Sequence, residues 1–139
     1  MKIFLDANIL VAVLNREYPL FTYAARILSL VDHPRFEVYT SPICLAIAFY
    51  FAEKKSGTQS AKNKISLLSK KLKITTTDYN TVNSVAENPA IYDYEDGLEY
   101  YSAINSGCEI IITEDVSDFY FSEIQVYDSI SFLENLNIV

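Results

Sequence analysis

The stretch Lys2-Ile3-Phe4-Leu5-Asp6-Ala7-Asn8 decides the fold of this chain. Its apolar run, which has no polar alternation, predicts a strand that is buried on both faces of a sheet. Asp6 then stands at the carboxyl end of that strand, and in open α/β sheets ligands bind outside this edge. A carboxylate in this place favours a cation site, although capping of the next helix explains the same residue equally well.

Length and composition limit the classes of protein to which this chain can belong. The chain has 139 residues, half of them hydrophobic, so we expect a single folded domain over residues 1–139 with a substantial core. No apolar run approaches the ~20 residues that span a bilayer, and no signal peptide precedes the first strand. We therefore expect a cytoplasmic protein with no membrane partner. Cys44 and Cys108 lack metal-ligand spacing and are expected to be buried small hydrophobes.

The charges are unevenly distributed along the chain. Residues 1–53 carry −1, residues 54–77 carry +7 from seven lysines, and residues 78–139 carry −13, which makes the formal net charge −7. An acidic chain is a poor general nucleic-acid binder, but a basic segment can still hold a phosphate backbone. A solvated helical face is the more ordinary explanation of these lysines, and docking of an acidic partner is a third. The candidate backbone contacts are Lys54, Lys55 and Lys62.

Strands and helices alternate along the whole chain. The expected strands cover residues 3–5, 36–40, 72–75, 109–113 and 124–127. The expected helices cover residues 9–14, 19–31, 42–55, 59–71, 78–87, 94–106 and 129–136. This pattern predicts an α/β fold, a three-layer α/β/α arrangement around a mainly parallel five-stranded sheet with helices on both faces. The helix over 42–55 is apolar almost all round, so we expect it to be central; Thr77 and Asp93 are the expected caps of two later helices.

Acidic residues recur at three places on the same side of this predicted sheet. They are Asp6 after the first strand, Asp93, Glu95 and Asp96 at the start of a helix, and Glu114, Asp115 and Asp118 after the fourth strand. Clustered carboxylates repel one another, and a hard divalent cation with oxygen ligands, Mg²⁺ or Mn²⁺, is the usual remedy. Helix capping explains Asp93 and Glu95 as well. Asn8 and Thr113 are expected to add polar contacts, and Asp118 to be either a further ligand or a supporting residue.

Three ordered blocks of this sequence resemble PIN domains. They are residues 3–10, 93–103 and 110–119, and the resemblance covers nearly the whole chain. Families of this type include VapC-like toxins, so the resemblance implies a metal-dependent ribonuclease that is often dimeric and often inhibited by an antitoxin. Asp6, Asp96 and Asp115 match the acidic positions of the family. Asp118 matches an aspartate that some members use and others do not.

The sequence departs from this family pattern in one helix. The family usually places an acid in the helix after the second strand, about two turns from its start. Here that position falls near Ile47, and no acid lies between Ser41 and Ala52. Glu53 comes six residues later, about 9 Å along a helix, which is too far to reach the same cation. One ligand fewer is expected to weaken cation binding.

Two classes of function therefore remain in competition. The first is a metal-dependent endoribonuclease of PIN-domain type, in which Asp6, Asp96 and Asp115 are catalytic and RNA is the substrate. The second is a catalytically degenerate PIN-fold protein that binds protein or RNA, which Ile47 favours. A phosphatase with a nucleophilic aspartate is less well supported, because Asn8 occupies the place of its second acid and the acidic half carries no lysine.

Overall fold

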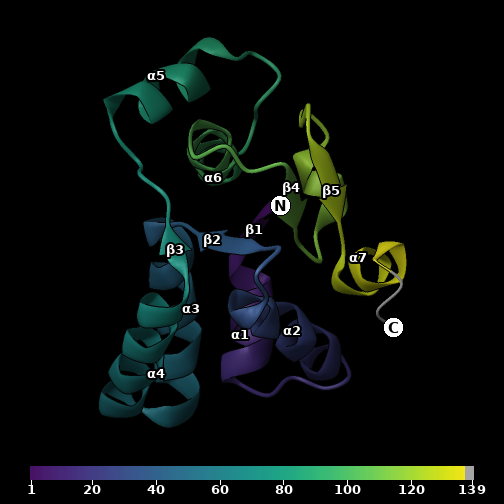
Figure 1. Ribbon diagram of the computed structural model, residues 1–139. Coiled ribbons are helices and arrows are strands. Elements are labelled where there is room, and N and C mark those ends of the chain that lie inside the picture. The colour runs from purple at the N-terminus through teal and green to yellow at the C-terminus, as the bar shows by residue number, and fades with distance from the viewer. Residues whose placement is uncertain (137–139) are drawn as a thin grey trace.

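The sheet of this protein is parallel throughout and has β1 at its centre. The computed structural model describes residues 1–136 and arranges the strands in the order β3-β2-β1-β4-β5 (Figure 1). All four strand pairs are parallel, as the alternation of strands and helices predicted. The strands are β1 (Lys2–Leu5), β2 (Glu37–Thr40), β3 (Lys73–Ile74), β4 (Ile110–Ile112) and β5 (Gln125–Tyr127).

The register of β1 against β4 places two sequence-distant segments side by side. Leu5 pairs with Ile112, so that Asp6 and Thr113 leave the sheet next to each other at its carboxyl edge. The Asp6 backbone N–H donates to the Ile112 carbonyl at 3.0 Å and thus extends the ladder by one residue. Because both strands are parallel, the polar residues that follow them meet at one edge of the sheet.

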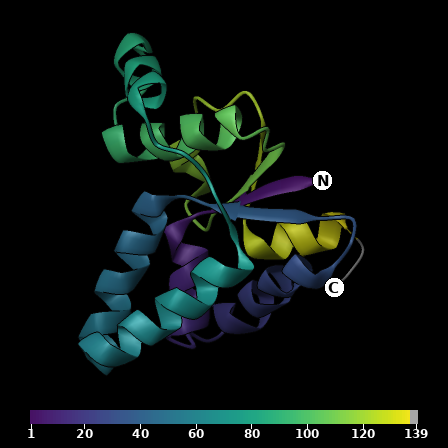
Figure 2. The same cartoon turned by 60° about the vertical axis from the view of Figure 1, so that its left-hand side comes forward.

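Helices cover both faces of the sheet, which confirms the predicted three-layer arrangement. They are α1 (Ala7–Leu14), α2 (Leu20–Leu28), α3 (Pro42–Ser56), α4 (Thr58–Lys71), α5 (Tyr79–Glu87), α6 (Tyr94–Asn105) and α7 (Ser129–Asn135), with 3-10 turns η1 (Ser29–Asp32) and η2 (Val116–Phe119). Helices α5 and α6 lie on one face, and α1, α2 and α7 lie on the other (Figure 2). Helix α3 packs against α1 and α4. Among residues 1–136, no helix combines the length and apolar character that crossing a bilayer demands.

The core is formed by β1 and the apolar faces around it. Ile3, Phe4 and Leu5 have no exposed surface, as expected for a strand covered on both sides. The expectation that the helix over 42–55 is central was wrong. Helix α3 buries only the small-residue stripe of Cys44, Ala48 and Ala52, whereas Tyr50 and Phe51 are exposed. Its composition reflects an apolar outer face rather than burial all round.

Several helix ends differ from the sequence prediction, among them the start of α5 and the end of α2. The predicted cap Thr77 was wrong, because Asp78 caps α5: its carboxylate accepts from the Thr81 N–H at 3.2 Å, and the Thr81 hydroxyl accepts from the Asp78 N–H at 3.3 Å. This reciprocal pair satisfies two backbone donors, which Thr77 alone does not. The predicted continuous helix over 19–31 ends at Leu28 and continues as the η1 turn.

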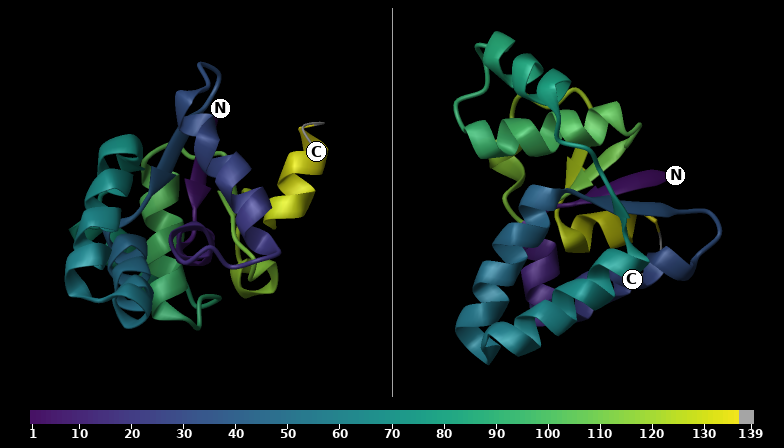
Figure 3. Two further views of the ribbon diagram at one scale, coloured as in Figure 1. Left: turned by 90° about the horizontal axis from the view of Figure 1, so that it is seen from below. Right: turned by 90° about the vertical axis from the view of Figure 1, so that its left-hand side faces the viewer.

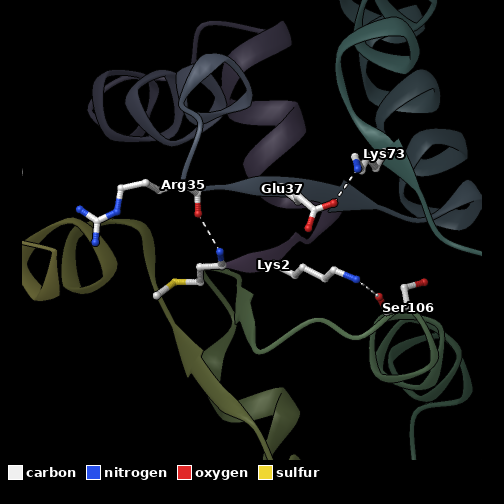
Figure 4. Close-up of polar contacts among 6 residues, drawn as sticks. Lys2, Arg35, Glu37, Lys73 and Ser106 are labelled. Carbon is white, nitrogen blue, oxygen red and sulfur yellow. Dashed lines mark hydrogen bonds and ion pairs between the residues drawn. The ribbon is translucent and has the colours of Figure 1, made fainter.

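The amino edge of the sheet carries a separate set of polar contacts (Figure 4). The Lys73 ammonium pairs with Glu37 at 2.6 Å and holds the pKa of that carboxyl below its usual range. Lys2 donates to the Ser106 carbonyl at 3.4 Å, and the N-terminal amine donates to the Arg35 carbonyl at 2.7 Å. These contacts are exposed or half-buried, so they tie chain segments together at the edge opposite Asp6 without forming a charged core.

Gly97 allows α6 to lie close to α5 and to the segment that joins the two helices. A Cβ on this buried glycine would lie 2.8 Å from Val85 Cγ1 and 2.8 Å from Ile91 Cγ2, which is too short for a normal contact. We expect Gly97→Ala to lower the free energy of unfolding by about 1 kcal/mol, because overpacking outweighs the gain in helix propensity. Urea unfolding measures this loss. Asn105→Ala, an exposed change in the same helix, should stay within about 0.5 kcal/mol of wild type, and an equally stable Gly97→Ala would contradict the expectation.

Candidate active site

An acidic cavity of about 480 Å³ opens at the carboxyl edge of the sheet. Figure 3 shows the elements around this edge, with α6 on one side and α1 and α3 on the other. The residues predicted from the sequence that line the cavity are Asp6, Asn8, Asp93, Glu95, Asp96, Glu114, Asp115 and Asp118. Glu17 adds a further carboxylate to its wall. Among the residues that the structure describes, no lysine, arginine or histidine lines the cavity, so the acids face one another without a basic side chain between them.

Asp6 lies in the floor of the cavity and is held by three donors. Its Oδ1 accepts from the Ala7 N–H at 2.7 Å, and its Oδ2 accepts from the Thr113 hydroxyl at 2.7 Å. The Cys44 thiol lies 3.8 Å from Oδ1. The side chain therefore caps α1, one of the two explanations that the sequence left open, and it also lines the cavity, where the cation site stays a prediction.

Thr113 and Asn8 connect Asp6 with Asp115. The Thr113 hydroxyl donates a hydrogen bond to Asp6 and accepts from Asn8 Nδ2 at 3.0 Å and from the Asp115 N–H at 3.1 Å. Asn8 Nδ2 also lies 3.3 Å from Asp115 Oδ2, and Asn8 Oδ1 accepts from the Glu114 N–H at 3.2 Å. Both residues thus lie where the sequence placed them, and together they fix the segment that follows β4 against the start of α1.

Replacement of Thr113 tests this network. Thr113→Val removes one donor and two accepted hydrogen bonds at a buried position, so we expect it to lower the free energy of unfolding by about 1–3 kcal/mol. The isosteric methyl keeps the packing volume, so the loss reports the hydroxyl alone. Thr113→Ser keeps the hydroxyl and should retain most of the stability in urea unfolding. Equal stabilities of the valine and serine variants would show that the hydroxyl network contributes little.

The second group of acids comes from the start of α6. Asp93 caps this helix by accepting from the Asp96 N–H at 3.0 Å, which confirms its predicted capping role. Burial and the neighbouring carboxylates of Asp93, Asp6, Asp118 and Glu95 raise the pKa of Asp96 to about 7. The pKa of Glu95 is also raised, mainly by burial and by Asp93. Both pKa shifts arise first from burial and then from repulsion between the carboxylates, and a bound cation would relieve this repulsion.

Two acids after β4 have different surroundings. Asp118 is exposed on η2 and lines the cavity, where it adds to the charge that raises the pKa of Asp96. Its part in binding a cation stays a prediction. Glu114 also lines the cavity, but its carboxylate accepts from the Ser129 hydroxyl and from the Ser129 N–H, the latter at 3.2 Å. Glu114 therefore secures the start of α7.

Helix α3 presents apolar side chains to the cavity. Ile47 lines its wall, at the position where the sequence led us to expect an acid, and Phe51 follows one turn later. Glu53 does not line the cavity, as its distance along the helix predicted; it accepts from the Thr58 hydroxyl at 2.8 Å instead. The replacement of the expected acid by Ile47 therefore affects the wall of the acidic cavity directly.

The structure reveals a buried acid beside Asp6 that sequence reasoning missed. Glu99 on α6 is 1% exposed, and its ligand atom lies within 4.8 Å of those of Asp6 and Cys44. Burial, and next the Asp6 carboxylate, raise the pKa of Glu99 to about 10. Burial also raises the pKa of the Cys44 thiol, so this group stays protonated. The signal in the sequence was the spacing: Glu99 lies three residues after Asp96 and therefore shares its helix face.

The lysines proposed to contact RNA lie outside the cavity. Lys54 extends over the Tyr50 ring at 4.3 Å, and Lys55 donates to the Asn15 carbonyl just beyond the end of α1. Lys62 is exposed on α4. The structure therefore gives Lys55 a role in securing the end of α1, whereas contacts of these lysines with a phosphate backbone stay a prediction.

Comparison with known proteins agrees with this architecture. The model of the PIN domain family matches residues 2–117. Ribonuclease VapC1 of Aquifex aeolicus (strain VF5) is 24% identical over 140 residues, which cover 98% of this chain and 96% of the relative. The solved structure of VapBC2 from Rickettsia felis, bound to a DNA fragment from its promoter, has a TM-score of 0.68 at 18% identity and covers 92% of this chain and 98% of its own.

A second solved structure also has a similar fold. Mycobacterium tuberculosis VapC20, a sarcin-ricin loop cleaving toxin, has a TM-score of 0.66 at 18% identity and covers 88% of this chain and 98% of its own. The family match spans most of the chain. In this protein, the acids at the carboxyl edge of the sheet lie in one cavity. The chain belongs to the PIN domain family.

Proposed function

We propose that this protein is a metal-dependent endoribonuclease of the VapC-like kind. The observation that carries the proposal is the meeting of Asp6, Asp96 and Asp115, from three separate segments, in one acidic cavity at the carboxyl edge of the sheet. The resemblance to Ribonuclease VapC1 along nearly the whole chain supports the same reaction. RNA is then the substrate, and the bond broken is a phosphodiester.

The donor set of the cavity fits Mg²⁺ or Mn²⁺. Its candidate ligands are carboxylate oxygens, which these hard cations prefer. Asp6, Asp96 and Asp115 would hold the cation, with Asp118 near it. A cation bound there lowers the pKa of a water molecule and stabilises the displaced phosphate oxygen.

The side chains of this protein have separate tasks in such a reaction. Thr113 and Ala7 fix both oxygens of Asp6, so that its orientation is set before any ligand arrives. Asn8 holds Asp115 through its amide. Asp96, with a pKa of about 7 in the cation-free state, is half protonated near neutral pH and must release this proton to ligate. Ile47 and Phe51 provide an apolar wall beside the acids, suited to a ribose or a base.

We also propose that an antitoxin-type protein is a partner of this chain. The support is the likeness in fold to the Rickettsia felis VapBC2 structure. A partner of this kind would control when the cavity is accessible to RNA. Copurification of the chain with the product of an adjacent gene would test this part of the proposal.

Cleavage of RNA by the purified chain tests the main proposal. We expect single-stranded and stem-loop RNAs, labelled at one end, to be cut at internal positions with Mg²⁺ or Mn²⁺ and to remain intact with EDTA. Asp115→Asn should lose at least ~100-fold in rate, because it removes one of three proposed ligand charges. Asp32→Asn makes the same chemical change on an exposed residue outside the cavity and should cut as wild type does. Cutting that persists in EDTA or in Asp115→Asn would overturn the proposal.

A catalytically degenerate binding module is the second candidate, and Ile47 is the observation that favours it. This apolar residue lines the cavity where an acidic ligand is expected. Ile47→Glu separates the two candidates. Cleavage that is present only in Ile47→Glu would identify the natural chain as degenerate, whereas cleavage by the wild type that Ile47→Glu merely increases would identify a nuclease.

A further inference from the structure

Glu99 is a carboxyl group buried in the interior of the protein. Within residues 1–136, only Asp6 and Glu99 are buried acids, and Glu99 is the less exposed of the two at 1%. Its Oε2 has no hydrogen-bond partner. A buried carboxyl group normally acquires donors or a positive charge, because burial otherwise leaves its desolvation uncompensated. Glu99 therefore requires an explanation.

The surroundings of Glu99 are acidic rather than basic. No lysine, arginine or histidine of the described residues forms an ion pair with it, since the one ion pair among these residues joins Lys73 and Glu37. Instead, the ligand atoms of Asp6, Cys44 and Glu99 lie within 4.8 Å of one another. Two buried carboxyl groups this close to one thiol form a group of ligand atoms, not a salt bridge.

Glu99 is connected to the cavity through Asp6. Asp6 lines the cavity and lies beside Glu99, although Glu99 does not itself line the wall. Asp96, one turn earlier on α6, lines the cavity from the same helix face. Helix α6 therefore directs two carboxyl groups towards Asp6, one from the cavity wall and one from the interior.

Helix α3 explains why a second acid from α6 is needed. Ile47 occupies the place of the expected acid, and Cys44, one turn earlier, is the α3 residue that lies beside Asp6 and Glu99. Helix α3 thus contributes the thiol of Cys44 and the apolar side chain of Ile47 to the site, but no carboxylate. The missing carboxylate is available from α6 instead.

We propose that Glu99 is a metal-ligating residue, which binds a divalent cation together with Asp6 and so supplies the acid that position 47 lacks. This inference rests on the proposed function, because it assigns a fourth acid to the same cation site. The partly accessible carboxylates of Asp96 and Asp115 would admit the cation, and the buried carboxylates of Asp6 and Glu99 would hold it from the interior.

Binding of Mn²⁺ to the metal-free protein, followed by the electron paramagnetic resonance of free Mn²⁺, tests the proposal without an activity assay. Glu99→Gln keeps the shape of the side chain and removes the ligand charge, so we expect the Kd for Mn²⁺ to rise at least ~10-fold. Glu134→Gln makes the same change on an exposed residue of α7 and should leave the Kd unchanged. Ile47→Glu in the Glu99→Gln background should restore binding, which a merely structural role of Glu99 would not allow.

The outcomes separate this proposal from the proposed function. If Asp115→Asn weakens Mn²⁺ binding and Glu99→Gln stays within twofold of wild type, Glu99 is not a ligand and the three-acid site stands. If the wild type binds no Mn²⁺ at millimolar concentration, the cation site itself is wrong and both proposals fall. Circular dichroism checks that Glu99→Gln is folded. If it is not, Glu99→Asp, which withdraws the carboxylate by one methylene, should weaken binding, and an unchanged Kd would overturn the proposal.

Discussion

Asp6→Asn is expected to lower cation-dependent RNA cleavage by at least ~100-fold while the protein remains folded. The variant loses the carboxylate charge at the centre of the acidic group. Its amide oxygen can still accept from the Ala7 N–H, so the variant loses only the acceptor of the Thr113 hydroxyl, whose two lone pairs already accept from Asn8 and Asp115. Asparagine caps a helix as well as aspartate does, so α1 keeps its start. Cleavage rates and urea unfolding of the same preparation measure the two effects separately.

Asp6→Ala is the matched variant for this prediction. It also removes the charge, but it leaves the Ala7 N–H and the Thr113 hydroxyl without their acceptor, so we expect an additional loss of about 1–2 kcal/mol in stability. Cleavage should be lost in both variants and stability mainly in the alanine one. Wild-type cleavage by Asp6→Asn would remove Asp6 from the reaction.

Glu99→Gln is expected to stabilise the metal-free protein at alkaline pH. The folded protein keeps a proton on Glu99 up to about pH 10, whereas the unfolded chain releases it near the ordinary glutamate pKa of 4.5. Between these values the folded state binds more protons than the unfolded state, so stability falls by about 1.4 kcal/mol for each pH unit. Glutamine carries no such proton. Its advantage should be small near pH 5 and should reach several kcal/mol near pH 8.

Urea unfolding in EDTA at pH 5 and pH 8 measures this pH dependence. The difference between wild type and Glu99→Gln should grow as the pH rises, and Glu134→Gln should show no such growth because that side chain is exposed. A difference that is constant with pH would mean that Glu99 does not carry the extra proton. Together with the Mn²⁺ titration, the experiment asks whether one residue lowers stability in the metal-free state and raises affinity for the cation.

Most of the fold and the meeting of the acids could be predicted from the sequence. The unbroken apolar run before Asp6 and the similar run before Thr113 predicted two buried parallel strands, and parallel strands end at one edge. The residues after them therefore had to meet, as Asp6 and Asp115 do through Thr113 and Asn8. The residue pattern of each strand was sufficient to predict this meeting, because parallel strands place their carboxyl ends at the same edge of the sheet.

The features that the sequence did not reveal depend on tertiary packing. The apolar composition of α3 gave no indication of which side faces solvent, and the small residues Cys44, Ala48 and Ala52 form the buried stripe. Glu99 resembled the exposed acids of the same block, because helical spacing alone does not say which face of α6 lies against Asp6. The α5 cap depended on a reciprocal bond between Asp78 and Thr81 that competed with Thr77.

The strand order has a consequence for the synthesis of this protein. The hydrogen bond between Thr113 and Asp6 joins residues 107 positions apart, and β1 lacks its β4 neighbour until the segment around Thr113 has been translated. A nascent chain emerges from its amino end, and contacts between such distant segments form late. A ribosome that is still translating this message therefore carries a chain whose acids have not met. The RNA-cleaving site proposed for this protein therefore cannot assemble before the segment around Thr113 has left the ribosome.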